Sequence, residues 1–213
     1  MSGRTFSRLG AIASERWGMV TTSQASAAGI PRKTLSGLAA SGAVERVAQG
    51  VYRMAGAPAA VLEIDTIRIH WLALGGSVSV VAAGVTATTL HSIGDWFPNT
   101  SDFVTPTRRT TRLDGVRLRT KVLHSVDVTL VDGLPTMTVE RAIADLIEAR
   151  EDPSLIADAL RHAAQRGTFL RPRRFAQLLD PLAHRNGEVT GGALAGRLML
   201  AAGLDKSWTA RLQ

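Results

Sequence analysis

The chain has 213 residues, enough for one large domain or two small ones, each with its own hydrophobic core. Its net charge of +7 favours a polyanionic partner. The absence of cysteine excludes disulfides, thiolate catalysis and cysteine-based zinc sites, and no apolar stretch approaches the roughly 20 residues that span a membrane. With no signal-peptide pattern at the N-terminus, we expect a cytoplasmic protein without membrane contact.

The N-terminal stretch predicts a helix, then a helix-turn-helix, then a β-hairpin. Apolar residues from Phe6 to Trp17 recur at helical spacing and predict the first helix. Gly29 suits a tight turn that requires a positive φ. Pro31 suits the first position of the next helix, because the N–H that a proline lacks would be unpaired there anyway. Gly42 ends that helix.

The second helix of this pair is cationic and hydroxylic on its outer side, as expected of a helix that reads the major groove of DNA. A hairpin follows over Val44–Ala48 and Val51–Met54, and it predicts a wing that contacts the DNA backbone or a minor groove. The alternative is a small helical hairpin that only packs on the rest of the chain. The candidate DNA contacts are Ser23, Arg32, Lys33, Thr34, Ser36, Arg46, Gln49 and Arg53.

The small-residue stretch AGAPAA at 55–60 is the predicted linker. We therefore expect a winged helix-turn-helix domain over residues 1–56 and a second domain over residues 61–213. The overall class is α+β, and the second, α/β domain has a small sheet and a helical C-terminal part. Its strands are expected near 78–81, 102–105, 116–121 and 126–131, and its helices over 62–74, 82–93, 153–166, 173–184 and 191–202 and after the capping residue Thr138.

Charge is distributed along the chain in blocks. Residues 1–56 hold seven Lys/Arg against two Asp/Glu, and residues 106–125 hold six against one. The second block is a candidate basic surface with two open interpretations. It can bind a partner, which is nucleic acid or an acidic protein. Alternatively, it pairs with the acidic helix that carries Asp145 and Glu148. That acidic helix is expected to be a solvated face or a docking surface. The members of the candidate basic surface are Arg108, Arg109, Arg112, Arg117, Arg119 and Lys121.

The sequence carries no recognisable catalytic or metal-binding motif. Restriction-type nucleases place an acidic residue two positions before a lysine, so that the pair can hold a metal and activate water. Here Pro31, Arg119 and Leu204 occupy the positions two before the three lysines. The histidines show no close pairing of the kind that metal ligands need. We therefore expect no enzymatic activity, no metal and no cofactor.

Two stretches of the chain together resemble two domains of one protein family. The first is GMVTTSQASAAGIPRKTLSGLAASGAVERVAQGVYRM, and the second is FVTPTRRTTRLDGVRLRTKVLHSVDVTLVDGLPTMTVERAIADL. The first resembles the winged helix of AbiEi-family antitoxins from type IV toxin–antitoxin systems, and the second is similar to that family's second domain. The resemblance covers roughly residues 6–150. Its most specific part ends in Gly50-Val51-Tyr52-Arg53, with Val51 and Tyr52 as apolar anchors and Arg53 as an outward cation.

The chain departs from the family pattern at Pro31, where relatives often carry a Ser or Thr that would cap the recognition helix. The resemblance implies a repressor of its own operon that binds inverted repeats in double-stranded DNA. It also implies an antitoxin that counteracts a nucleotidyltransferase-like toxin, functionally or by direct contact. We expect a monomer or weak dimer in solution that pairs on DNA. The alternative is a toxin-binding module in which the winged helix is only a scaffold.

Overall fold

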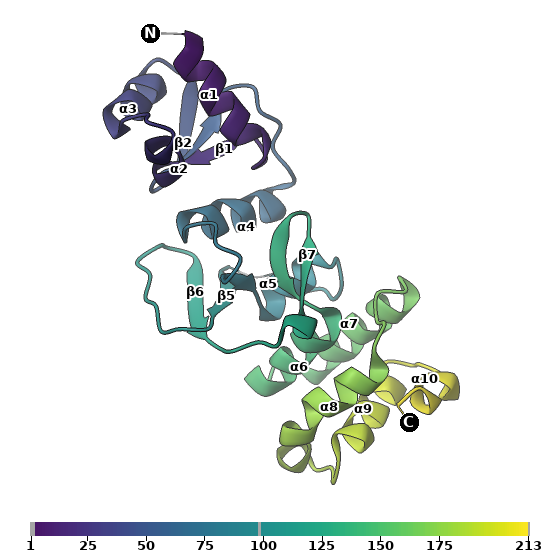
Figure 1. Ribbon diagram of the computed structural model, residues 1–213. Coiled ribbons are helices and arrows are strands. Elements are labelled where there is room, and N and C mark those ends of the chain that lie inside the picture. Colours follow the sequence, from purple (N-terminus) through teal and green to yellow (C-terminus); the bar gives the residue numbers. More distant parts are fainter. Residues whose placement is uncertain (1–2, 98, 213) are drawn as a thin grey trace. The chain divides into compact units, whose positions relative to one another are not determined.

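The computed structural model describes residues 3–97 and 99–212, which form two compact units (Figure 1). The first unit extends to Ser77 and also includes Thr111–Asp114, and the second comprises Val78–Thr110 and the chain from Gly115 onward. The predicted linker at 55–60 forms neither helix nor strand. The division nevertheless falls after Ser77, because the helix that follows the linker packs with the first unit. The first unit is thus longer than the residues 1–56 expected for it.

The first unit combines short helices with a three-stranded antiparallel sheet of strand order β1-β3-β2. Leu9, Leu35 and Tyr52 lie in its hydrophobic core. Figure 1 shows the strands of this unit flanked by α1 and α3. In chain order its elements are α1 (Gly3–Ser14), β1 (Met19–Thr21), α2 (Thr22–Ala27), α3 (Arg32–Ala40), β2 (Val44–Ala48), β3 (Val51–Met54) and α4 (Leu62–Ala73).

Thr21 and Gln24 form a capping box at the start of α2. Thr21 Oγ1 accepts the N–H of Gln24 at 3.1 Å, and Gln24 Oε1 accepts the N–H of Thr21 at 2.9 Å. The isosteric replacement Thr21→Val removes the hydroxyl, and we expect it to lower the free energy of unfolding by about 1 kcal/mol. Urea denaturation measures this loss. Thr21→Ser, which keeps the hydroxyl, is the control, and an unchanged stability of Thr21→Val would contradict the capping role.

Aromatic contacts hold α4 in the first unit. The ring of Trp71, which is 1% exposed, meets Trp17 edge-on with the ring centroids 6.1 Å apart and the planes at 73°. The guanidinium of Arg16 lies 5.3 Å from the Trp71 ring centre, and that of Arg68 lies 4.9 Å from the Trp17 ring centre. Because the two tryptophans and two arginines interleave, α4 is fixed to the segment that follows α1.

The second unit contains a five-stranded mixed sheet of strand order β6-β5-β4-β8-β7. β6 runs parallel to β5 and β4 parallel to β8, whereas the other neighbours are antiparallel. Asp132 and Gly133, with φ of 50° and 78°, form the tight turn between β7 and β8. The elements are β4 (Val81–Ala82), α5 (Gly84–Leu90), β5 (Ser101–Thr105), β6 (Val116–Thr120), a 3₁₀ helix (Ser125–Asp127), β7 (Val128–Val131) and β8 (Leu134–Met137).

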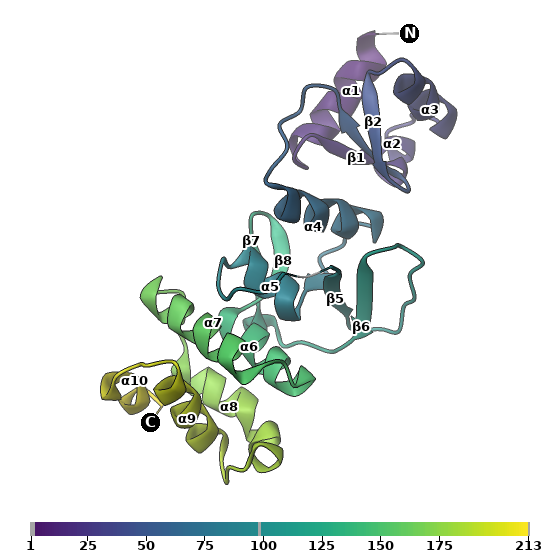
Figure 2. The ribbon, with the colours of Figure 1, turned by 180° about the vertical axis from the view of Figure 1, so that it is seen from behind.

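A helical part completes the second unit. Its α8 and α9 lie side by side in both views (Figures 1 and 2). Thr138 caps α6 as predicted, because its hydroxyl accepts the N–H of Arg141 at 3.5 Å. The predicted α+β class, with a small sheet and a helical C-terminal part, is confirmed. No helix among the described residues is long and apolar enough to cross a membrane. The helices are α6 (Val139–Ala149), α7 (Pro153–Gln165), α8 (Pro172–Ala183), α9 (Gly191–Ala201) and α10 (Lys206–Ala210), with a 3₁₀ turn at His184–Asn186.

Candidate nucleic-acid interface

The turn between α2 and α3 places a short cationic helix at the surface of the first unit. Gly29 has a φ of 73°, as its predicted position in the turn requires, and Ile30 returns to the core. Pro31 differs from the prediction. It is the extended residue before α3, with φ −65° and ψ 150°, so the helix begins at Arg32. Since proline has no hydrogen-bonding side chain, no side chain caps the first N–H groups of α3.

The predicted contacts on α3 lie on its outer side. Arg32, Lys33 and Ser36 are exposed, and Thr34 is half-buried. Among the described residues, no acidic side chain forms an ion pair with Arg32 or Lys33, so both charges face solvent without compensation. The Ser36 hydroxyl donates to the Arg32 carbonyl at 3.2 Å, which leaves its oxygen available as an acceptor. The structure thus brings these four residues together on one helix.

The remaining predicted contacts are split between the hairpin and α2. Arg46 on β2, Gln49 in the hairpin turn and Ser23 on α2 are all exposed. The hairpin is irregular between Arg46 and Ala48, where the register with β3 shifts. These three side chains therefore lie on the surface of the same compact unit as the cationic face of α3.

Arg53 requires a correction. Its guanidinium pairs with the carboxylate of Asp65 on α4, and the two side chains are only 14% and 11% exposed. The prediction of an outward cation is wrong, because the sequence assigned α4 to the second domain and so hid the acidic partner. Arg53 is therefore removed from the candidate DNA contacts.

The candidate basic surface of the second unit is partly an internal ion-pair network. Arg119 on β6 donates from Nε and Nη2 to both oxygens of Asp102, at 3.0 and 2.7 Å, and also to Asp145 on α6. Lys121 donates to Asp145 and, at 2.7 Å, to Glu148. Of the two interpretations of this cluster, pairing with the acidic helix therefore holds for Arg119 and Lys121.

Asp145 is the centre of this network, with its side chain 1% exposed. Burial by itself raises the pKa of Asp145, but hydrogen bonds and charges from Arg119 and Lys121 outweigh burial and hold the pKa below its ordinary value of 3.8. Burial likewise opposes the charge of Arg119, yet its bonds to Asp145 and Asp102 raise the guanidinium pKa. Asp145 and Arg119 are therefore both charged at neutral pH, and their pairing is structural.

The expectation of a solvated acidic helix is wrong for two of its carboxylates. Asp145 and Glu140 are 1% and 2% exposed. Glu140 Oε1 accepts the backbone N–H groups of Leu170 and Arg171, at 2.9 and 2.8 Å, directly before α8 begins. Both carboxylates face inward, where each accepts hydrogen bonds from donors that are themselves partly removed from solvent.

The other members of the predicted basic surface remain exposed. Arg108 and Arg109 lie in the connection between β5 and β6, and Arg112 falls in the segment that clusters with the first unit. Arg117 is exposed on β6 and lines, with Arg119 and Asp102, a cavity of about 210 Å³. The structure therefore separates Arg119 and Lys121, which pair with Asp145, from the members of the cluster whose side chains are exposed.

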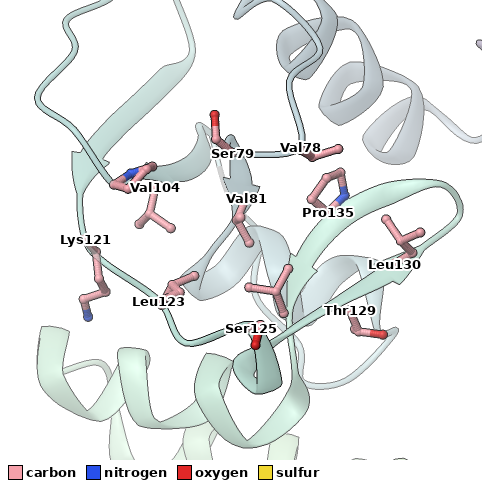
Figure 3. A pocket seen from close by; sticks show the side chains of 12 residues that line it. Val78, Ser79, Val81, Val104, Lys121, Leu123, Ser125, Thr129, Leu130 and Pro135 are labelled. Atoms are coloured by element: carbon pink, nitrogen blue, oxygen red, sulfur yellow. The ribbon is translucent and has the colours of Figure 1, made fainter.

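A mainly apolar cavity of about 430 Å³ lies on the second unit (Figure 3). Among the described residues that line it, Lys121 is the one charged side chain, and its amino group points away from the cavity toward its carboxylate partners. The cavity therefore suits uncharged apolar groups. Its aliphatic lining comes from several strands and their connections and consists of Val78, Val81, Val104, Leu123, Val128 and Leu130.

The segment that carries the candidate DNA contacts also matches a known protein family in sequence. Residues 7–55 match the AbiEi antitoxin family of transcriptional regulators. The resemblance inferred from the residues is thereby confirmed for this stretch, which runs from α1 to the residue after β3. All the candidate DNA contacts, from Ser23 to Gln49, lie within this AbiEi-type segment.

A solved structure extends the likeness of fold beyond the AbiEi-type segment. The crystal structure of the RV2827C protein from Mycobacterium tuberculosis matches this chain with a TM-score of 0.58 and 19% sequence identity. The match covers 98% of this chain and 80% of that protein. At this identity the likeness concerns the fold alone. No curated protein matches the sequence.

Proposed function

We propose that this chain is a DNA-binding transcriptional autorepressor and antitoxin, which binds inverted repeats upstream of its own gene and counteracts a nucleotidyltransferase-like toxin. The supporting observation is the exposed, uncompensated cationic start of α3, with Arg32 and Lys33, inside the segment that matches the AbiEi regulators. In this proposal α3 enters the major groove, and the β2–β3 hairpin, with Arg46 and Gln49, is the wing.

The first turn of α3 can supply two kinds of contact to a duplex. Its N–H groups, which no side chain caps, carry the positive end of the helix dipole and suit a phosphate. The guanidinium of Arg32 can instead donate two hydrogen bonds to the edge of a guanine, and this contact carries sequence information. The missing cap at Pro31 is thus compatible with DNA binding, because a phosphate can take the place of the absent side chain.

The variant Arg32→Ala tests the proposal directly. We expect it to weaken binding to the chain's own upstream region by about 1–3 kcal/mol and, where its contact is to a guanine, to relax the preference for that base. Fluorescence anisotropy with labelled duplexes measures both effects. Lys206→Ala on α10, in the second unit, is the matched charge control and should leave the affinity unchanged. Unchanged affinity in the Arg32→Ala, Lys33→Ala double variant would remove α3 from the interface.

Salt dependence separates DNA binding from a protein that only binds a toxin. For B-DNA the slope of log affinity against log salt is about −0.9 for each phosphate that the protein neutralises. A winged helix that serves only as a scaffold gives no DNA complex at any salt concentration. Co-expression with the neighbouring gene product, scored by growth, tests the antitoxin part independently of DNA.

A further inference from the structure

The free edge of β7 is used neither by the proposed DNA contacts nor by the ion-pair network. β7 is the last strand of its sheet and pairs only with β8. Leu130 lies opposite Pro135, which has no N–H, so the backbone groups of Leu130 point away from β8. The Val128 carbonyl points the same way, while the Val128 N–H donates to Ser125. Within 3–97 and 99–212, no element supplies a partner for the Leu130 backbone.

The two edges of this sheet differ in charge. β6 carries the exposed Arg117 next to the ion-paired Arg119, and an exposed cationic side chain on an edge strand opposes pairing with another strand. β7 has no charged residue, proline or bulge, and Leu130 on it is 68% exposed. Arg117 would therefore oppose the pairing of two β6 edges, whereas β7 itself brings no charge to the pairing of two β7 edges.

We propose that β7 pairs antiparallel with β7 of a second copy of this chain. A two-fold axis opposite Thr129 lets the Leu130 N–H of each copy donate to the Val128 carbonyl of the other. The two Thr129 residues then face each other as a non-hydrogen-bonded pair. Val128 and Leu130 lie on one face of the strand, so Leu130 of each copy packs beside Val128 of the other, at the apolar cavity.

The composition of the edge favours pairing with β7 of a second copy over pairing with an unrelated strand. The four residues of β7 are uncharged, so antiparallel pairing about Thr129 brings no like charges of the two strands together. Two backbone hydrogen bonds and a small apolar contact predict weak association in solution, well below the interface size of a stable dimer. The pairing goes beyond the proposed DNA binding and does not depend on it. On an inverted repeat, the duplex would raise the effective concentration of one copy for the other.

The natural absence of cysteine permits a direct test by crosslinking. Thr129 is exposed, and residues that face each other in a non-hydrogen-bonded pair lie close enough for a disulfide. We expect Thr129→Cys to form a crosslinked dimer under mild oxidation without DNA, at least roughly tenfold faster than Thr120→Cys on the exposed β6 edge. Equal rates for the two variants would overturn the proposal.

A second variant separates this edge from any other contact. Leu130→Lys places a charge on the pairing face, and we expect it to slow crosslinking of Thr129→Cys by roughly tenfold or more, because like charges in opposed strands repel. Sedimentation velocity of the cysteine-free chain, with and without Leu130→Lys, checks the same surface, and circular dichroism confirms that the variants fold. A concentration-dependent dimer that Leu130→Lys leaves intact would assign self-association elsewhere and overturn the proposal. Failure of DNA binding would leave the crosslinking result unaffected.

Discussion

Replacing Asp145 with asparagine should lower the free energy of unfolding of the second unit by about 3–5 kcal/mol. The carboxylate is 1% exposed and holds both Arg119 and Lys121, so an amide at this position leaves two cations with one buried counter-charge fewer. Urea denaturation measures the loss. Glu188→Gln is the matched control, because the Arg197–Glu188 pair lies at the surface, with Arg197 52% exposed, and such pairs contribute about 0–1 kcal/mol. Equal losses in the two variants would contradict a special role for the network.

The pH dependence of the same variant has a defined sign. The pKa of Asp145 is lower in the folded chain than its ordinary value of 3.8, so the folded state gains stability from the ionised carboxylate at neutral pH. That gain disappears as the pH falls through the unfolded value and on toward the lower folded value. We therefore expect the stability difference between the wild type and Asp145→Asn to be largest at pH 7 and to shrink below about pH 4. A constant difference across this range would contradict the assignment.

Trp71→Ala should destabilise the first unit by about 3–5 kcal/mol, because it removes a fully buried aromatic ring together with its edge contact to Trp17. Leu62→Ala on the same helix is the control. Leu62 is 78% exposed, and its truncation should change the stability by no more than about 0.5 kcal/mol.

Amide hydrogen exchange locates the Trp71 effect within the chain. We expect protection to fall in β3, which shares the first unit with α4, and to persist in α6, which belongs to the second unit. Undiminished protection of β3 would show that α4 contributes nothing to this unit. The same reasoning predicts that a chain ending at residue 56 lacks part of the core that the first unit needs.

Local signals were enough to predict the helix pair and the hairpin. Gly29 has the positive φ that its turn requires, and the Gln49-Gly50 turn joins the two predicted strands. These features depend on neighbours within a few residues, so the sequence carries them directly. Pro31 marks the limit of such reasoning: its fixed φ suits both the first helical residue and the residue before it, and only its ψ of 150° decides between them.

Tertiary partners explain what the sequence did not reveal. The strand pattern of Arg117, Arg119 and Lys121 predicts that they share a face, but the carboxylates that meet them come from β5 and α6. The linker stretch shows where regular structure stops, not with which unit the next helix packs. That choice depends on contacts such as Trp17–Trp71, whose members lie far apart in the sequence.

The ion pair between Arg53 and Asp65 joins the hairpin to α4. β3 is the central strand of the first sheet, and this pair connects it to α4, so we expect the hairpin to be ordered before any ligand arrives. A preorganised surface loses less conformational entropy on binding than a mobile one. In the proposed complex, Arg53 would thus strengthen binding without touching the duplex. Its removal should act through the heat capacity and entropy of association rather than through the preference for any base.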